Sequence, residues 1–337
     1  VTAVNRNGTE EPGFAISGAG NPDLEPQRSK EVELGFEAGM LEDRVGLDFT
    51  YYTKDSEHDI ITAPLPPSAG ASATQAKNLG LMRNRGVEIG LNLDPVRSSE
   101  LSWSLRASFS HNDNELVRFD QEPIDFGLLG STQRHVEGFP AGGYWQKPIE
   151  SYTDSNGDGL IGADEVQVGD TAVFLGEVFP RTLFSLGTTV DVGHWLRLGG
   201  LLDFQGGHRQ FNATEWNRCN GTFATCAGRH DPDASLFEQA RAVAWDEYET
   251  VAGYIERADF WKLREVSATV RLPRSWVQNV SARDVSLTLA GRNLFTWTDY
   301  TGFDPEVNGS AQANFNTQDN TTLPPFRTFV LRFDVSF

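Results

Sequence analysis

The most restrictive feature of the sequence is the alternation of its last twelve residues, 326–337, between two faces. One face carries Phe329, Leu331, Phe333, Val335 and Phe337, and the residues between them are mostly polar. This period of two predicts a β-strand with one apolar and one polar side. An apolar face that ends in a bare aromatic residue suits a strand whose outward side chains meet lipid, as in transmembrane β-barrels.

Eight earlier segments share this two-faced alternation, and each is long enough to cross a bilayer as a tilted strand. The nine predicted strands are 30–41, 44–54, 85–96, 100–111, 181–192, 195–205, 259–272, 284–297 and 326–337. The repetition indicates that the alternation is the organising pattern of the whole chain.

The connections between these segments are alternately short and long. Short turns join the first eight strands in pairs, whereas the long connections cover 55–84, 112–180, 206–258 and 298–325. Short turns on one side and long loops on the other are typical of bacterial outer-membrane barrels, while a soluble sandwich has shorter strands and more even loops. The sequence therefore predicts an all-β fold, a transmembrane antiparallel β-barrel with long extracellular loops. A bacterial barrel made of one chain has an even number of strands. The nine predicted strands, or about nine to ten, with loops of this length therefore indicate the C-terminal part of a larger barrel.

The charge and the motifs exclude several classes of function. The formal net charge of −19 argues against a nucleic-acid partner, which would need clustered Lys and Arg. The sequence lacks the nucleophile elbow, the zinc-protease helix motif and the phosphate-binding loop, so an enzyme is not expected.

Residues 154–165 match the twelve-residue calcium-binding loop position by position. The flanking sequences do not predict helices, so we expect an isolated loop with a structural calcium ion in the 112–180 region. The alternative is a tight Asn-Gly and Asp-Gly turn with surface acids. The predicted ligands are Asp154, Asn156, Asp158, Leu160 through its carbonyl, and Glu165.

The only cysteines, Cys219 and Cys226, have the wrong spacing for a zinc site. A local disulfide that closes a loop, in an oxidising compartment, is the expected arrangement, and free cytosolic thiols are the alternative.

Aromatic residues punctuate the long connections. Their faces could stack on a sugar, although loop packing and interfacial belts also use such residues. The candidate substrate contacts are Tyr144, Trp145, Trp216 and Trp245.

Several segments, in this order and spacing, resemble the C-terminal barrel region of SusC/RagA-type TonB-dependent outer-membrane transporters. They are NPDLEPQRSKEVELGFEAG (21–39), NLGLMRNRGVEIGLN (78–92), DSNGDGLIGADEVQVGD (154–170), ADFWKLREVSATVRLP (258–273) and GRNLFTWTDYTGFDPEV (291–307). The resemblance implies a 22-stranded barrel in the outer membrane of a Gram-negative bacterium, with an N-terminal plug domain that is absent from residues 1–337. It also implies energy from the TonB complex, a SusD-like lipoprotein partner, and import of oligosaccharides or peptides.

Two alternatives to this transporter remain open from the sequence. One is a secreted or surface glycan-binding β-protein stabilised by calcium, and the other is a passive porin or autotransporter barrel. If the polar strand faces line a lumen, their acidic residues are expected to contact the plug or water rather than substrate. These residues are Glu31, Glu33, Glu37, Asp48, Glu88 and Asp94.

Overall fold

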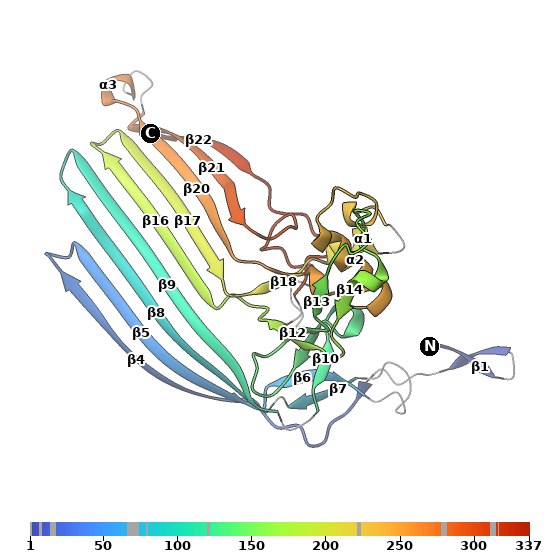
Figure 1. Ribbon diagram of the computed structural model, residues 1–337. Coiled ribbons are helices and arrows are strands. Elements are labelled where there is room, and N and C mark those ends of the chain that lie inside the picture. The colour runs from blue at the N-terminus through green and yellow to red at the C-terminus, as the bar shows by residue number, and fades with distance from the viewer. Residues whose placement is uncertain are drawn as a thin grey trace.

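A nine-stranded antiparallel sheet dominates the computed structural model (Figure 1). Strands that are neighbours in the sheet also follow one another along the chain, in the order β22-β21-β20-β17-β16-β9-β8-β5-β4. The structure describes residues 2–6, 9–13, 18–65, 74–78, 80–119, 122–220, 224–277, 282–310, 315 and 317–337. The sheet strands are β4 (Arg28–Met40), β5 (Val45–Glu57), β8 (Leu81–Arg97), β9 (Leu101–Arg118), β16 (Thr182–Val192), β17 (Leu196–Gly206), β20 (Phe260–Arg271), β21 (Asp284–Thr298) and β22 (Thr328–Ser336).

Every predicted strand is present in this sheet, but β8 and β9 are longer than predicted. β9 continues to Arg118, so the predicted loop region 112–180 in fact begins after that residue. The alternation of apolar and polar residues ends earlier because both faces are polar at residues 83–84 of β8 and 112–115 of β9, as where Arg83 pairs with Glu115. Arg83 also forms a two-pronged ion pair with Asp55, at 2.6 and 2.7 Å. The extended ends of these strands therefore suit water rather than lipid.

The two faces of the sheet have opposite character. One row of paired positions crosses eight strands through Phe36, Phe49, Ile89, Phe109, Phe184, Phe204, Trp261 and Trp297. The neighbouring row, on the other face, includes Asp48, Ser108, Ser185 and Asp203. The apolar face stays uncovered, and Phe36 and Phe329 expose 55% and 72% of their surface. We refer to these as the apolar face and the polar face.

Most of the remaining elements gather at one end of the sheet, opposite the end with the short turns, where α3 lies between β20 and β21 (Figure 1). They belong mainly to 119–181, 207–259 and 299–327, which we call the loop body. The strands outside the large sheet are β1 (Thr2–Arg6), β2 (Thr9–Gly13), β3 (Gly18–Ala19), β6 (Ile60–Pro64), β7 (Thr74–Asn78), β10 (Ile124–Phe126), β11 (Gln133–His135), β12 (Gly143–Gln146), β13 (Ile149–Tyr152), β14 (Val166–Val168), β15 (Val173–Gly176), β18 (Arg209–Phe211) and β19 (Ile255–Arg257).

The helices are short. They are α1 (Ala213–Cys219), α2 (Leu236–Tyr248) and α3 (Arg274–Val277), with 3-10 turns at Leu128–Gly130, Ala163–Glu165, Ala227–Arg229 and Ala252–Tyr254. α2 was not predicted from the sequence. Its start carries a capping box, in which Ser235 precedes the helix and Glu238 lies in the first turn. In the described part of the chain, no helix has the length and apolar character needed to span a membrane.

The largest hydrophobic cluster lies in the loop body, whereas smaller clusters lie at the two ends of the sheet, around Leu116 and around Val285. The largest cluster draws residues from β12, β18, α1 and the segment around Tyr254. The members of this cluster are Tyr144, Val178, Phe211, Ala213, Trp216, Cys219, Cys226, Val251, Tyr254 and Ile255. The long connections are thus a folded body with its own interior, rather than the irregular loops that the sequence predicted.

Candidate transport mouth

A buried ion cluster fastens the loop body to the polar face of the sheet. Lys262, near the start of β20, is 2% exposed and its ammonium donates to both carboxylate oxygens of Asp304, at 2.7 and 2.8 Å. The same ammonium donates to Glu306 at 2.6 Å. Arg264 joins Glu306 to Asp203 of β17. Segment 299–327 is therefore held against the sheet by paired charges.

Glu306 remains ionised in this cluster although burial opposes its charge. Burial raises its pKa, but hydrogen bonds from Arg264 and Lys262 outweigh that effect and hold the pKa at about 2. Charged donors favour the ionised form of a carboxyl group, so Glu306 keeps its negative charge at neutral pH.

A second network joins separate parts of the loop body around Tyr144. The Tyr144 hydroxyl donates to the Thr317 carbonyl at 2.6 Å and accepts from the Phe211 backbone amide at 3.2 Å. Burial raises the pKa of Tyr144 to about 12, so the phenol stays neutral. Nearby, the Tyr300 hydroxyl donates to Asp319 at 3.1 Å. Three long connections therefore share one hydrogen-bonded interior.

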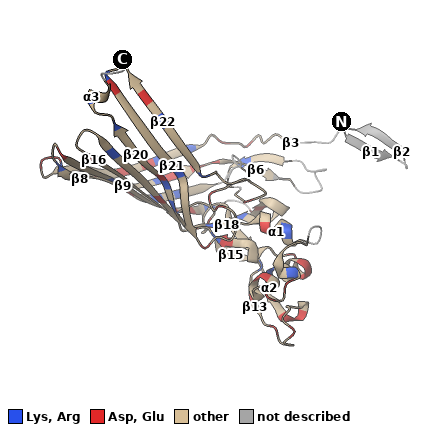
Figure 2. Cartoon of the chain, turned by 90° about the horizontal axis from the view of Figure 1, so that it is seen from above, with Lys and Arg blue, Asp and Glu red and all other residues tan. Residues whose placement is uncertain are grey.

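The pairing of charges on the polar face differs from strand to strand, and Figure 2 marks the charged residues along the ribbon. Ion pairs balance the acids of β16, β17 and β20, namely Asp191 with Arg197, Asp203 with Arg264 and Glu265 with Arg292. On β4, β5 and β8, four predicted lumenal acids form no ion pair with any described residue. They are Glu33, Glu37, Asp48 and Glu88, and Glu37 pairs directly across the strands with Asp48. Like charges placed in this way repel each other unless water or a cation lies between them.

The calcium-type loop connects β13 and β14, so β-strands and not helices flank it, as the sequence predicted. Asp154 accepts from the backbone amides of Gly157 at 2.7 Å and Gly159 at 3.0 Å. Gly159 has a φ of 84°, the left-handed conformation that the sharp turn requires. Asn156 and Asp158 accept from amides two residues further on, and Leu160 lies beside them in the loop.

Glu165 folds back over the start of this loop. It accepts from the Ser155 amide and hydroxyl at 2.7 and 2.8 Å, and from the Gly162 amide at 2.9 Å. The hydrogen bond from the Gly162 amide, followed by those from Ser155, lowers the pKa of Glu165 to about 2. In the described residues, the carboxylates of Asp154, Asp158 and Glu165 do not all converge within 4.8 Å of one another. The loop is closed, but its three acids do not share one point.

α2 supports the calcium-type loop from one side. The Gln239 side chain, which is 1% exposed, accepts from the Ile161 amide at 2.8 Å. Its amide nitrogen donates to the Gly159 carbonyl at 3.1 Å. A buried side-chain amide thus fixes the middle of the loop to the helix.

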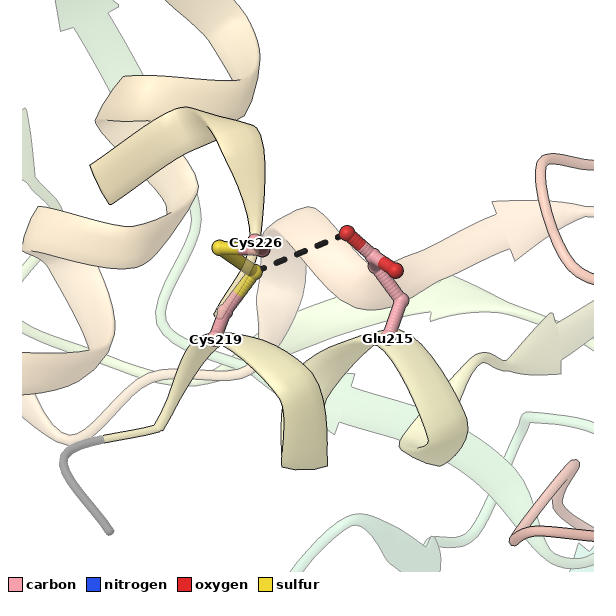
Figure 3. Close-up of side chains that lie close together, drawn as sticks. All are labelled: Glu215, Cys219 and Cys226. Atoms are coloured by element: carbon pink, nitrogen blue, oxygen red, sulfur yellow. Dashed lines mark hydrogen bonds between the residues drawn. A yellow bond between two sulfur atoms is a disulfide. The ribbon is translucent and has the colours of Figure 1, made fainter. Parts of the chain in front are cut away.

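Cys219 and Cys226 form a disulfide at the end of α1 (Figure 3). Glu215 lies beside it, with Oε1 3.6 Å from the sulfur of Cys219. These three residues are the one group of potential metal ligands that converges within the described part of the chain. Both sulfurs are engaged in the disulfide, so they cannot serve as thiolate ligands.

The four aromatic residues proposed as substrate contacts pack within the loop body instead. Tyr144 is fully buried, and Trp145 and Trp216 are 9% and 8% exposed. Trp245 is partly buried and meets Trp216 edge to face, with ring centroids 5.1 Å apart. A buried ring cannot present its face to a sugar, so this burial argues against the predicted substrate contact and assigns these rings to core packing.

Comparisons with known proteins agree with this architecture. A family model described as "TonB dependent receptor-like, beta-barrel" matches residues 3–294. TonB-dependent receptor P3 of Formosa agariphila is 27% identical over 96% of this chain and 36% of its own length. TonB-dependent receptor SusC of Bacteroides thetaiotaomicron is 21% identical over 94% of this chain and 32% of its own length.

The fold also matches that of a solved transporter. The RagAB peptide transporter aligns with a TM-score of 0.75 and 22% identity, over 100% of this chain and 38% of that chain. The chain spans little more than a third of the length of the relatives it matches. The family match and the shared fold confirm the predicted β-barrel class and its SusC/RagA resemblance. The chain belongs to the TonB-dependent receptor β-barrel family, and its nine-stranded sheet is part of the wall of an outer-membrane barrel.

Proposed function

We propose that the protein containing this chain imports a nutrient across the outer membrane by TonB-dependent transport. The observation that carries the proposal is the arrangement of the loop body, which folds over one end of a barrel wall and is tied to its polar face by the Lys262 cluster. In this orientation the loop body lies outside the cell, at the entrance to the lumen. The family match supports an energised importer rather than an enzyme.

Oligosaccharides or peptides are the substrate classes that we propose. Support for a peptide comes from the RagAB peptide transporter, which shares the fold, and oligosaccharides are the other class that the SusC/RagA resemblance implies. The test is uptake of fluorescent oligosaccharides and peptides by cells that carry the complete gene, with and without a proton-motive uncoupler. Energised import predicts that the uncoupler abolishes uptake. Uptake that continues with the uncoupler would instead identify a passive porin.

We also propose a SusD-like lipoprotein as partner and a plug domain within the lumen. The unpaired acids of β4, β5 and β8 support a plug or water as their neighbour, because these charges lack cations in the described part of the chain. Purification of the tagged complete protein from its host should recover a lipoprotein in equal amount. Recovery of the barrel protein alone, from membranes solubilised in a mild detergent, would count against the lipoprotein partner.

A structural calcium ion in the loop 154–165 is a further part of the proposal. The support is the residue pattern, the positive φ at Gly159 and the closed shape that Glu165 and Gln239 impose. Binding would turn Glu165 from the backbone amides toward the ion, which would be held by oxygens of Asp154, Asn156, Asp158 and Leu160.

Calorimetry on the complete protein with calcium tests this site. We expect heat of binding that Asp158→Ala removes and Asp164→Ala preserves, because Asp164 is exposed and occupies a position that does not supply a ligand. An increase in melting temperature with calcium should follow the same pattern. No heat, or equal heat in both variants, would show that the loop is a turn with surface acids.

A further inference from the structure

A small cavity of about 240 Å³ lies where the polar faces of β8 and β9 meet the loop body. It is lined by residues of both strands, of the turn after β11, of the segment after β15 and of the connection 299–327. These are Met82, Asn84, Asn112, Asn114, Pro140, Ala141, Glu177, Val178, Phe179, Pro180 and Phe315. The cavity is too small for a complete ligand, since whole-ligand pockets are about 300–1,000 Å³, but it has room for one unit of a longer one.

Three asparagine side chains form a connected cluster in the wall of this cavity. The Asn84 oxygen accepts from the side-chain nitrogens of Asn112 at 3.3 Å and Asn114 at 2.9 Å. The Asn112 oxygen accepts from the Tyr52 hydroxyl at 3.0 Å, and the Asn114 oxygen accepts from the Ala141 amide at 2.9 Å. Every carboxamide oxygen in the cluster is therefore engaged.

The N–H groups of the cluster are only partly used. A carboxamide has two N–H donors, and Asn112 and Asn114 each commit one of theirs to Asn84. The hydrogen bonds of the Asn84 side chain to described residues all go to its oxygen, so its nitrogen is left to face the cavity that Asn84 lines. The wall thus presents a surplus of hydrogen-bond donors to whatever occupies this space.

Opposite groups give the cavity an acceptor and an apolar surface. The Glu177 side chain is 15% exposed and one of its oxygens lies 3.3 Å from the Arg181 guanidinium. Burial raises the pKa of Glu177 to about 7, so near neutral pH its carboxyl group can both accept and donate. Phe179 lines the cavity and exposes half of its surface. No Lys, Arg or His is among the lining residues, which disfavours an anionic occupant.

We propose that this cavity is a subsite for one neutral sugar unit of the transported substrate, with the Asn84 amide as its main hydrogen-bond donor. The inference rests on the proposed import function and specifies its substrate class. Sugar hydroxyls both donate and accept, so one ring can satisfy the asparagine N–H groups and Glu177 together. The apolar face of the ring would lie on Phe179. Peptide groups have a fixed donor and a fixed acceptor, and they match this mixed wall less well.

Asn84→Asp tests the subsite with little disturbance to its surroundings. The new carboxylate keeps the oxygen that accepts from Asn112 and Asn114, loses the two N–H donors that face the cavity, and adds one negative charge. Binding of short neutral gluco-, manno- and galacto-oligosaccharides and of uncharged peptides is measured by calorimetry on the purified complete protein. We expect at least one oligosaccharide to bind the parent protein and to bind Asn84→Asp about tenfold more weakly, the effect of one lost hydrogen bond.

Asn92→Asp is the matched control, because Asn92 lies further along the same strand on the same face, exposed and outside the cavity. It should bind as the parent does, and both variants should keep the parent melting temperature. Three results would overturn the subsite: unchanged oligosaccharide binding in Asn84→Asp, binding of the uncharged peptides only, or no binding of any neutral oligosaccharide. Uncoupler-sensitive uptake tests the import function separately. The sugar subsite can therefore be refuted while TonB-dependent import stands, and the reverse.

Discussion

At the scale of single residues, Lys262 is the most important contact between the loop body and the barrel wall. It is buried and contacts two carboxylates, whereas Arg197 forms an exposed pair with Asp191. Lys262→Met keeps most of the side-chain volume but leaves Asp304 buried without its cation. We expect a loss of about 3–5 kcal/mol, seen as a lower melting temperature in detergent.

Arg197→Met provides the comparison for Lys262. An exposed pair contributes at most about 1 kcal/mol, so this variant should melt close to the parent. Equal shifts in the two variants would contradict the role given to the buried cluster.

Two buried histidines should make the loop body sensitive to acid. Burial lowers the pKa of His135 and of His208 to about 4, and neither Nδ1 has a partner among the described residues. Because the pKa of each histidine is lower in the folded protein than in the unfolded chain, the unfolded chain takes up protons first as the pH falls. The contribution of the neutral histidines to the free energy of unfolding is therefore complete above pH 6.5 and is lost as the pH falls from 6.5 toward 4. At pH 5 the loss is roughly 2 kcal/mol for each histidine.

His135→Phe removes one of these proton sites within a group of aromatic rings that includes Phe126, whose centroid lies 4.7 Å from that of His135. The decrease in melting temperature between pH 7.5 and pH 5 should become smaller in this variant. His194→Phe, at an exposed turn, should keep the parent profile. An identical pH dependence in all three proteins would refute the assignment.

At the scale of elements, one close approach fixes β5 against β8. The ring of Tyr52 lies over Gly86, where a Cβ would come within 2.4 Å of the Tyr52 hydroxyl and 2.7 Å of the His111 carbonyl. Gly86→Ala should displace Tyr52 from Asn112 and cost about 1–3 kcal/mol, measured as a melting shift. Gly20→Ala, where nothing lies within 4 Å, should have little effect. A stable Gly86→Ala protein would show that the ring can move aside freely.

The strands were predictable from the sequence because lipid and lumen impose a period of two on every strand. Leu287, Leu289 and Phe295 show how directly the apolar residues mark the outer face of β21. The extended ends of β8 and β9 escaped prediction, since residues 83–84 and 112–115 are polar on both faces and break the alternation. The burial of Tyr144 and Trp216 also escaped it, because it arises from contacts between distant connections that no local pattern records.

The candidate site was predictable only in part. Asp154, Asn156 and Asp158 were found because the calcium loop is a local pattern. The Lys262 cluster and the asparagine cluster join residues far apart in sequence, so only the strand register brings them together.

At the scale of the whole molecule, the sheet is a barrel wall with one face toward lipid and the other toward the lumen. β9 offers the clearest alternation, with Leu105, Ala107 and Phe109 on one face and Arg106, Ser108 and Ser110 on the other. The two cysteines of residues 1–337 are joined in a disulfide, so they do not compete for the label with a cysteine introduced at one of these positions.

The most direct test is a spin-label scan of residues 105–110 in the complete protein, reconstituted in lipid vesicles. Accessibility to oxygen, which concentrates in lipid, and to a water-soluble nickel chelate should alternate from one residue to the next. We expect oxygen to dominate at Leu105, Ala107 and Phe109, and no such preference at the residues between them. Equal accessibility along the strand, or an alternation of the opposite phase, would contradict the barrel wall.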